Sequence, residues 1–222
     1  SASLRANAFP AQTMKHLSTL LLALATATLS QAQSPAPVAT EYGLVQGVTE
    51  SDLTVYRGIP FAAPPIGDLR WRSPQPAAKW QGVRAADKFG PDPYQGDGKG
   101  NVSEDCLYLN LWTAGLNDGG KRPVMLWLHG GGFTQGSGGN VRYDGTNLAH
   151  RHNVVLVTIN HRLNAFGHLY LAEWGGAKYA DSGNCGVLDI VAALRWVRDN
   201  IQEFGGDPDN VTIFGKSGGG AK

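Results

Sequence analysis

Three nearly continuous runs of apolar residues constrain the fold of this chain more than any other feature. The runs are Val124–Leu128, Val154–Ile159 and Val211–Phe214. A strand that is apolar on both faces needs cover on both faces, so such runs are typical of parallel sheets flanked by helices. We therefore expect these runs to be covered strands of one α/β sheet.

The segment between the second and third runs has the periodicity of a helix. Apolar residues recur at spacings of three and four at Val187, Ile190, Val191, Leu194, Val197, Ile201 and Phe204. Gly205 and Gly206 follow, and glycine commonly supplies the left-handed residue at which a helix ends. Strand, helix and strand in this order predict a right-handed crossover and an α/β class.

The segments before these runs give weaker signals. Gly43–Val48 and Leu53–Tyr56 flank a polar turn and predict a β-hairpin. Residues 58–82 are rich in proline and tryptophan, with little periodicity, and predict an irregular path. Cys106–Trp112 alternates and predicts a strand with one wetter face. We find no internal repeat, and we expect one domain.

The N-terminal segment resembles a targeting signal rather than part of a fold. An apolar stretch, Leu17–Leu29, follows Met14 and a lysine, and small residues end at Ala32. This pattern predicts a signal peptide over residues 14–32, too short for a permanent transmembrane span, and a secreted or periplasmic product. We interpret residues 1–13 as an extraneous or upstream-translated leader.

The composition excludes several classes of protein. The net charge is +1 and no long basic run occurs, so nothing indicates a nucleic-acid partner. The chain has 2 cysteines, Cys106 and Cys185, too few for a disulfide scaffold. They either pair with each other or lie as separate buried thiols.

One serine stands in a glycine turn directly after the third apolar run. Residues Gly215–Gly219 match G-x-S-x-G, the turn that exposes a nucleophilic serine between a strand and a helix. A phosphate-binding loop would need glycine at Asn210. A trypsin-like site belongs to an all-β fold. The remaining alternative is a glycine turn in which Ser217 is merely structural.

A second glycine run argues against that structural alternative. His129 and three glycines directly follow the first apolar run, and Phe133 ends the segment. Consecutive glycines allow backbone N–H groups to point at one position, as the oxyanion of ester cleavage requires. In lipases and esterases, such an element accompanies the serine turn.

These motifs together resemble the type-B carboxylesterase family, the α/β-hydrolases that include cholinesterases and bile-salt lipases. The similarity covers residues 41–222 and rests on Tyr56–Pro65, Leu69–Trp71, Ser103–Asn110, His129–Phe133, Asn160–Gly167, Gly183–Asp189 and Gly215–Gly219. The resemblance implies an α/β-hydrolase fold with a central, mostly parallel sheet flanked by helices. Residues 33–222 would be the N-terminal part of such a domain, truncated after the nucleophile turn.

The resemblance also implies roles for individual residues. Ser217 would be the nucleophile, and the backbone N–H groups of Gly131, Gly132 and Gly218 would form the oxyanion hole. No metal or cofactor is implied.

Four further residues match two internal salt bridges of the family. Arg70 would pair with Glu104, and Arg162 with Asp189. We interpret both pairs as buried scaffold, because a paired buried ion is not free to act as an acid or base.

Three departures from the family pattern affect specificity. Lys216 stands where the family usually has glutamate, which favours neutral or acidic esters over cationic ones. Pro93 occupies the place of the cysteine that normally pairs with Cys106, so we expect that disulfide to be absent. The loop over residues 93–106 has no tryptophan to hold a quaternary ammonium, which argues against choline esters.

The order of the catalytic residues completes the prediction. In α/β-hydrolases the acid and the histidine follow the serine, but all 6 histidines here precede Ser217. We expect a hydrolase that cleaves small-molecule carboxylic esters through an acyl-enzyme, with residues 33–222 inactive alone. The alternative is a non-catalytic, cholinesterase-like module for binding or adhesion.

Overall fold

The computed structural model describes residues 34–116 and 118–222. The predicted leader, residues 1–13, and the predicted signal peptide, residues 14–32, lie outside this part of the chain. Within the described residues, no helix is long and apolar enough to cross a membrane.

In the described chain, strands β1 to β9 precede the first α-helix, and strands and helices are mixed only after that point. The strands are β1 (Val38–Thr40), β2 (Gly43–Gln46), β3 (Val48–Glu50), β4 (Leu53–Pro60), β5 (Val83–Ala85), β6 (Asp92–Pro93), β7 (Val102–Ser103), β8 (Tyr108–Thr113), β9 (Arg122–Leu128), β10 (Val155–Ile159) and β11 (Gly206–Gly215). The helices are α1 (Thr146–His152), α2 (Asn164–His168), α3 (Ala172–Gly175) and α4 (Cys185–Asn200), with short 3₁₀ turns between them.

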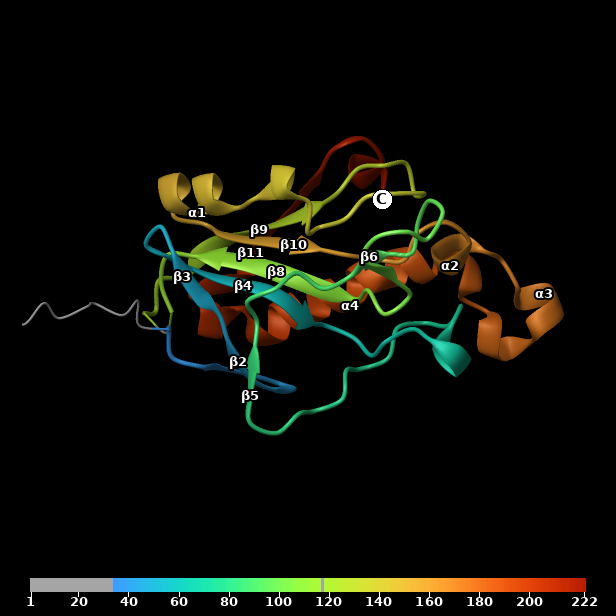
Figure 1. Cartoon of the computed structure of the whole chain (residues 1–222), viewed down its shortest axis with the longest axis horizontal. Coiled ribbons are helices and arrows are strands. Elements are labelled where there is room, and N and C mark those ends of the chain that lie inside the picture. The colour runs from blue at the N-terminus through green and yellow to red at the C-terminus, as the bar shows by residue number, and fades with distance from the viewer. Residues whose placement is uncertain (1–33, 117) are drawn as a thin grey trace, which may run out of the picture. The chain divides into compact units, whose positions relative to one another are not determined.

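Six strands form the central sheet in the order β11-β9-β10-β8-β4-β3 (Figure 1). The three apolar runs lie side by side in β9, β10 and β11, which are parallel to one another. The other three strands pair antiparallel. The sheet is therefore mixed, with its parallel half built from the runs that predicted it.

The predicted hairpin forms with β4, but its first strand is β3, Val48–Glu50, and not the predicted Gly43–Val48. β3 and β4 pair antiparallel across Ser51 and Asp52, whose φ angles of 49° and 64° suit a two-residue turn. The chain turns away at Gly47, where an added Cβ would lie 2.4 Å from the carbonyl oxygen of Val55. β2 therefore leaves the hairpin.

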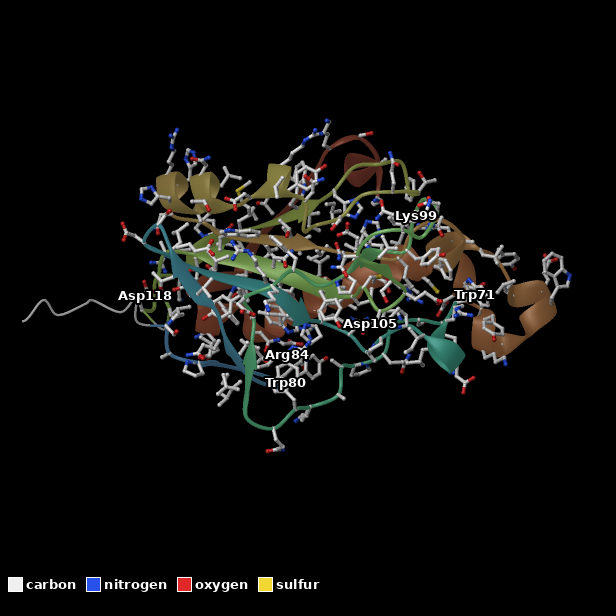
Figure 2. The ribbon with its side chains drawn as sticks, viewed as in Figure 1. Trp71, Trp80, Arg84, Lys99, Asp105 and Asp118 are labelled. Atoms are coloured by element: carbon white, nitrogen blue, oxygen red, sulfur yellow. The ribbon has the colours of Figure 1, made fainter. Side chains whose placement is uncertain are left out.

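β2 joins a second sheet of order β1-β2-β5. Trp80 and Arg84 lie together beside it (Figure 2), with the Arg84 guanidinium 5.5 Å from the centre of the indole ring. The Trp80 indole N–H donates to the carbonyl of Leu44 in β2. Val38 of β1 and Val45 of β2 are buried in the main hydrophobic cluster, so this small sheet packs against the core.

Helices cover both faces of the central sheet. Val155 and Val157 of β10 pack in a cluster with Ala193 and Trp196 of α4. Leu156 points the other way, into a cluster with Ala149 of α1. All five residues of β10 are consequently buried, as its apolar sequence predicts, and α1 and α4 lie on opposite sides (Figure 1).

β11 differs from the expected covered strand. Ile213 is 50% exposed, and Thr212 is exposed as well. The reason is position: within the described chain β11 is the edge of the sheet and has only β9 beside it. An apolar run specifies a strand, but its burial depends on the neighbours that the fold supplies.

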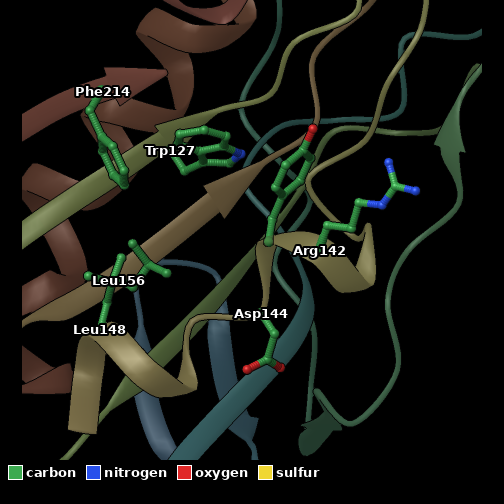
Figure 3. Close-up of a pocket in the computed structure, with 7 residues that line it drawn as sticks. Trp127, Arg142, Asp144, Leu148, Leu156 and Phe214 are labelled. Carbon is green, nitrogen blue, oxygen red and sulfur yellow. The ribbon is translucent and has the colours of Figure 1, made fainter. Parts of the chain in front are cut away.

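A cavity of about 150 Å³ lies on the α1 face, between α1 and the ends of the parallel strands (Figure 3). The Trp127 ring packs against Phe214 and Tyr143, with ring centres 5.0 and 5.1 Å away. Ser217 does not line this cavity. We treat it as a packing feature of the sheet rather than as the candidate site.

β8 also differs from its prediction, because neither face of the strand is exposed to solvent. It lies between β10 and β4, and the one polar side chain in its middle, Asn110, is only 3% exposed. The side-chain oxygen of Asn110, Oδ1, accepts a hydrogen bond from the N–H of Gly58, and its side-chain NH₂ donates to the Thr158 hydroxyl. A polar residue is tolerated here because its hydrogen bonds are made inside the protein.

The predicted helix is α4, and it is followed by a 3₁₀ turn, Ile201–Phe204. The turn ends at Gly205 in the left-handed conformation, φ 76°. Val187 is 37% exposed although it fits the apolar spacing, whereas Trp196, outside that spacing, is 1% exposed. The spacing thus predicted the helix correctly and part of its buried face incorrectly.

The two cysteines do not form a disulfide with each other. Cys106 and Cys185 are both free, buried thiols. Burial raises the pKa of each thiol, so neither is activated as a thiolate.

Candidate active site

Ser217 occupies a strained position between β11 and a short 3₁₀ helix, Ser217–Ala221. Its φ is 55°, in the left-handed region that residues with side chains rarely adopt, and its surface is exposed. The turn closes by a hydrogen bond of 2.9 Å from the N–H of Gly219 to the carbonyl of Lys216. A left-handed serine at the end of a strand presents its hydroxyl to solvent.

The glycines of this turn are required by its contact with the end of β9. A Cβ added to Gly219 would lie 2.1 Å from the carbonyl oxygen of Leu128, and one added to Gly215 would lie 2.8 Å from the same atom. Both distances are shorter than real Cβ contacts allow. The turn can pack against β9 only because these positions have no side chain.

The second glycine run follows β9 directly and is also left-handed. Gly131, Gly132 and Phe133 have φ angles of 106°, 69° and 89°. The phenylalanine is the most unusual of these, because a bulky residue is strongly disfavoured at positive φ. The backbone N–H of Asn164 donates to the Phe133 carbonyl at 2.7 Å and holds it in place.

The serine turn and the glycine run meet at two points. A Cβ added to Gly218 would lie 2.8 Å from the backbone nitrogen of Gly132. A Cβ added to Gly130 would lie 3.5 Å from the Cβ of Ser217. The fold therefore brings Ser217 beside the glycine run, although 84 residues lie between Gly132 and Ser217 in the sequence.

Backbone donors are available at this meeting point. Within the described residues, neither the N–H of Gly131 nor that of Gly132 donates a hydrogen bond. Gly218 lies in the first turn of a helix, where N–H groups have no acceptor within the helix. Free N–H groups next to an exposed hydroxyl can hydrogen-bond an anionic oxygen.

Two amide side chains hold the segment that follows the glycine run: Asn160, which belongs to a matched motif, and Gln95, which the sequence did not indicate. Gln95 accepts the N–H of Gly136 at 2.8 Å and donates to its carbonyl at 2.9 Å. Asn160 accepts the N–H of Gly138 at 2.8 Å. Both lie in loops or at a strand end, where an amide residue gives no periodic signal in the sequence.

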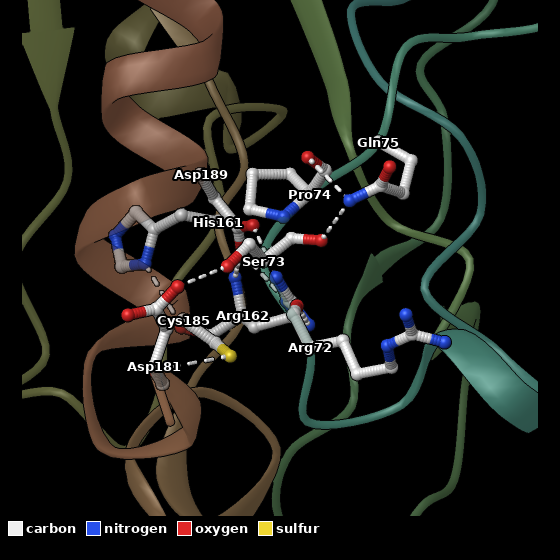
Figure 4. Close-up of polar contacts among 9 residues, drawn as sticks. All are labelled: Arg72, Ser73, Pro74, Gln75, His161, Arg162, Asp181, Cys185 and Asp189. Carbon is white, nitrogen blue, oxygen red and sulfur yellow. Dashed lines mark hydrogen bonds and ion pairs between the residues drawn. The ribbon is translucent and has the colours of Figure 1, made fainter. Parts of the chain in front are cut away.

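A buried salt bridge anchors the loop after β10 to α4 (Figure 4). Arg162 donates to both carboxylate oxygens of Asp189, at 2.7 and 2.9 Å, and the two side chains are 2% and 0% exposed. Arg162 also donates from its guanidinium to the Arg72 carbonyl and from its backbone N–H to Asp189. This pair is built into the scaffold and leaves no free acid.

The second pair, Arg70 and Glu104, is bidentate but not fully buried. One of its two hydrogen bonds is 2.6 Å long, and the side chains are 38% and 20% exposed. The expectation of a buried pair is therefore wrong for Arg70. Its guanidinium lies over the rings of Trp71 and Phe166, which explains how it is held at the surface.

Two buried histidines near the site, His129 and His161, contact each other rather than Ser217. His129 and His161 stack with ring centres 4.7 Å apart and an angle of 3° between the rings. Burial lowers the pKa of His129 to about 4 and that of His161 well below its usual value, so both rings are neutral. Neither is hydrogen-bonded to Ser217. Among the described residues, no cluster of side chains fits a metal ion.

The fold and the site together define an α/β-hydrolase with a serine turn and a glycine-rich loop. Residues 34–222 match the model of the carboxylesterase family. This chain belongs to that family.

Characterised relatives support the assignment. The chain is 48% identical over 189 residues to fumonisin B1 esterase of Sphingopyxis macrogoltabida, covering 81% of this chain and 34% of the relative. It is 44% identical over 191 residues to para-nitrobenzyl esterase of Bacillus subtilis, covering 82% and 38%. Among solved structures, a carboxylesterase of Geobacillus stearothermophilus matches with a TM-score of 0.78 and 50% identity, covering 82% and 38%. The chain thus spans little more than a third of the length of these relatives.

Proposed function

We propose that the protein containing residues 34–222 is a serine esterase that cleaves carboxylic esters of small molecules. The observation that carries this proposal is the exposed, left-handed Ser217 beside the free N–H groups of the glycine run. A structural serine would gain nothing from a backbone angle that costs on the order of 1–3 kcal/mol.

The chemistry assigned to these residues is a two-step acyl transfer. The Ser217 hydroxyl attacks the ester carbonyl, and the oxygen that becomes negative accepts hydrogen bonds from Gly131, Gly132 and Gly218. Loss of the alcohol leaves an acyl-enzyme, which water then hydrolyses to release the acid. Donors fixed in the backbone stabilise the oxyanion without rearranging during the reaction.

We assign the general base and the triad acid to other parts of the full-length protein. Of the described histidines, His129 and His161 are buried and stacked on each other, and the matched region is only 34% and 38% of the length of two relatives. In this fold family the acid and the histidine follow the serine in the chain. Residues 33–222 alone therefore contain the nucleophile and the oxyanion hole without the group that activates them.

The substrate class follows from the relatives and from local charge. Two relatives are named as esterases, fumonisin B1 esterase and para-nitrobenzyl esterase. The exposed Lys216 stands next to the nucleophile and disfavours cationic esters. We assign a neutral or acidic small-molecule ester, with no metal or cofactor in the reaction.

The experiment is covalent labelling of the full-length protein with a fluorophosphonate ester. We expect one modified serine, Ser217, located by peptide mass spectrometry, and parallel loss of hydrolysis of a nitrophenyl ester. Ser217→Ala should remain folded, because an exposed hydroxyl contributes little packing, and should take up no label. A folded, unreactive wild-type protein would instead favour the non-catalytic binding module.

Export is a separate part of the proposal. The small residues before Gln33 predict cleavage after Ala32. N-terminal sequencing of the mature protein should begin at Gln33. A cytoplasmic protein that retains Met14 would contradict secretion without affecting the esterase assignment.

A further inference from the structure

Lys222 lies five residues after Ser217 and makes contacts that the proposed reaction does not use. Its ammonium nitrogen lies 2.9 Å from Nε2 of His161 and 3.5 Å from the carbonyl oxygen of His129. The same nitrogen lies 5.2 Å from the centre of the Phe133 ring. A single cation thus contacts three residues that surround the glycine run.

The hydrogen-bond roles in this cluster follow from its acceptors. Nδ1 of His161 faces the carbonyl oxygen of Arg162 at 3.1 Å, so this nitrogen carries the ring hydrogen. Nε2 is then the bare acceptor, and Lys222 is the donor. Because burial keeps both His129 and His161 neutral, Lys222 holds the positive charge of the cluster.

These contacts join three separate elements of the site. His129 and Phe133 flank the glycines after β9, His161 follows β10, and Lys222 belongs to the segment after the serine turn. The stacked rings of His129 and His161 fill the space between the two strand ends. Any drift of the glycine run relative to Ser217 would break the contacts of Lys222.

We propose that Lys222 is a positioning residue whose ammonium ties the serine turn to the glycine run and so fixes the geometry of the oxyanion hole. The contribution of Lys222 to catalysis rests on the proposed function. The structural tie itself does not, because it consists of contacts made within residues 129–222.

The charge of Lys222 is sensitive to pH. Partial burial lowers its pKa to about 8. The titratable groups whose charges act within the cluster are His129, His161 and His168, with Asp92 acting on His129. The ammonium is therefore charged below about pH 8 and is lost as the pH rises through that value. An oxyanion hole held by this charge should weaken on the alkaline side.

The test compares Lys222→Met with Lys88→Met in the full-length protein, since Lys88 is exposed and remote from Ser217 in sequence. We expect Lys222→Met to lower kcat on the order of a hundredfold with little change in KM, as for a misplaced catalytic group. The wild type should lose activity with an apparent pKa near 8, and Lys222→Met should lack this alkaline limb. Lys88→Met should match the wild type in all respects.

Hydrogen exchange measured by mass spectrometry separates this inference from the proposed function. Peptides covering residues 129–136 should exchange faster in Lys222→Met than in Lys88→Met, whether or not the protein hydrolyses esters. If Lys222→Met fails to fold, Lys222→Gln keeps a donor without the charge and should show the same loss of the alkaline limb. Unchanged exchange and an unchanged pH profile would overturn the proposal, even in a protein whose Ser217 reacts with the phosphonate.

Discussion

The backbone angle of Ser217 and the absence of side chains around it belong to one arrangement. The left-handed φ turns the hydroxyl outward, and Gly215 and Gly219 let the turn press against the last residues of β9. Gly218 completes the contact, because a Cβ added there would lie 2.9 Å from the Cα of Gly132. Each of these glycines is required by a particular close contact, and a single substitution can test each contact separately.

Replacing Gly218 with alanine should disturb the oxyanion hole while leaving the fold intact. The new Cβ would lie 2.8 Å from the Gly132 nitrogen, so one loop must move away from the other. We expect kcat to fall on the order of a hundredfold, as for the loss of one oxyanion donor. Steady-state kinetics and the rate of phosphonate labelling measure this.

Gly220→Ala is the matched control for that substitution. A Cβ there would lie 3.5 Å from the Gly215 carbonyl oxygen, an ordinary van der Waals contact. Its kcat should equal that of the wild type. If both variants lost activity equally, the turn would be generally fragile and the specific contact with Gly132 would not be responsible.

The charge at Lys216 should control selectivity between cationic and neutral esters. A unit charge at about 4 Å contributes roughly 1 kcal/mol even in water, equivalent to about fivefold in rate. Lys216→Glu should therefore raise the ratio of kcat/KM for a choline ester to kcat/KM for its neutral isostere several-fold. Equal changes in kcat/KM for both esters would contradict the charge argument. Salt screens charges less at low concentration, so a difference between the esters that disappeared at low salt would contradict it as well.

At the scale of elements, α4 fixes the loop that leads from β10 toward the site. Asp189 lies in α4 and accepts three hydrogen bonds from Arg162 alone, two from the guanidinium and one from the backbone. Asn164, two residues further, in turn holds the Phe133 carbonyl. The helix thereby supports the glycine run through the loop after β10.

Removing the carboxylate of Asp189 should destabilise the protein strongly. Asp189→Leu leaves the guanidinium of Arg162 buried and unpaired, which costs about 3–5 kcal/mol. Arg162→Met in the same chain should recover much of this loss, except for the backbone N–H that remains without an acceptor, at about 1–3 kcal/mol. Urea unfolding of the full-length protein measures both. Asp199→Asn, in an exposed pair, should leave the midpoint nearly unchanged.

At the scale of the whole molecule, the sequence predicted the arrangement of elements better than their surroundings. The apolar runs and the helical spacing identified β9, β10, β11 and α4, because periodicity reports the local conformation directly. The same pattern could not place β11 at an edge or bury Asn110, since both depend on which strands lie beside them.

The sequence likewise predicted one part of the candidate site and not another. The glycine motifs pointed to Ser217 and its neighbours because backbone constraints restrict residue type strongly at those positions. Gln95 and Lys222 gave no such signal, since their partners are backbone groups or buried rings distant in sequence. Three-dimensional proximity alone reveals these supporting contacts.

The exposed edge of β11 leads to a prediction about residues 34–222 expressed alone. Ile213 and Thr212 are exposed on a strand with one neighbour in the described chain, and unpaired strand edges promote association. We expect this polypeptide to hydrolyse no nitrophenyl ester above background and to form soluble aggregates, measured by size-exclusion chromatography with light scattering.

A charge on that edge should reduce the aggregation without restoring activity. Ile213→Lys places a lysine where natural edge strands carry one, and the monomer fraction should rise. Val141→Lys is the control, because Val141 is 82% exposed but lies outside the sheet, so its substitution adds the same charge without blocking the edge. If both variants raised the monomer fraction equally, net charge rather than the β11 edge would explain the association. If the unmodified polypeptide were monomeric and turned over the ester, the missing base and acid would have to lie within residues 34–222 after all.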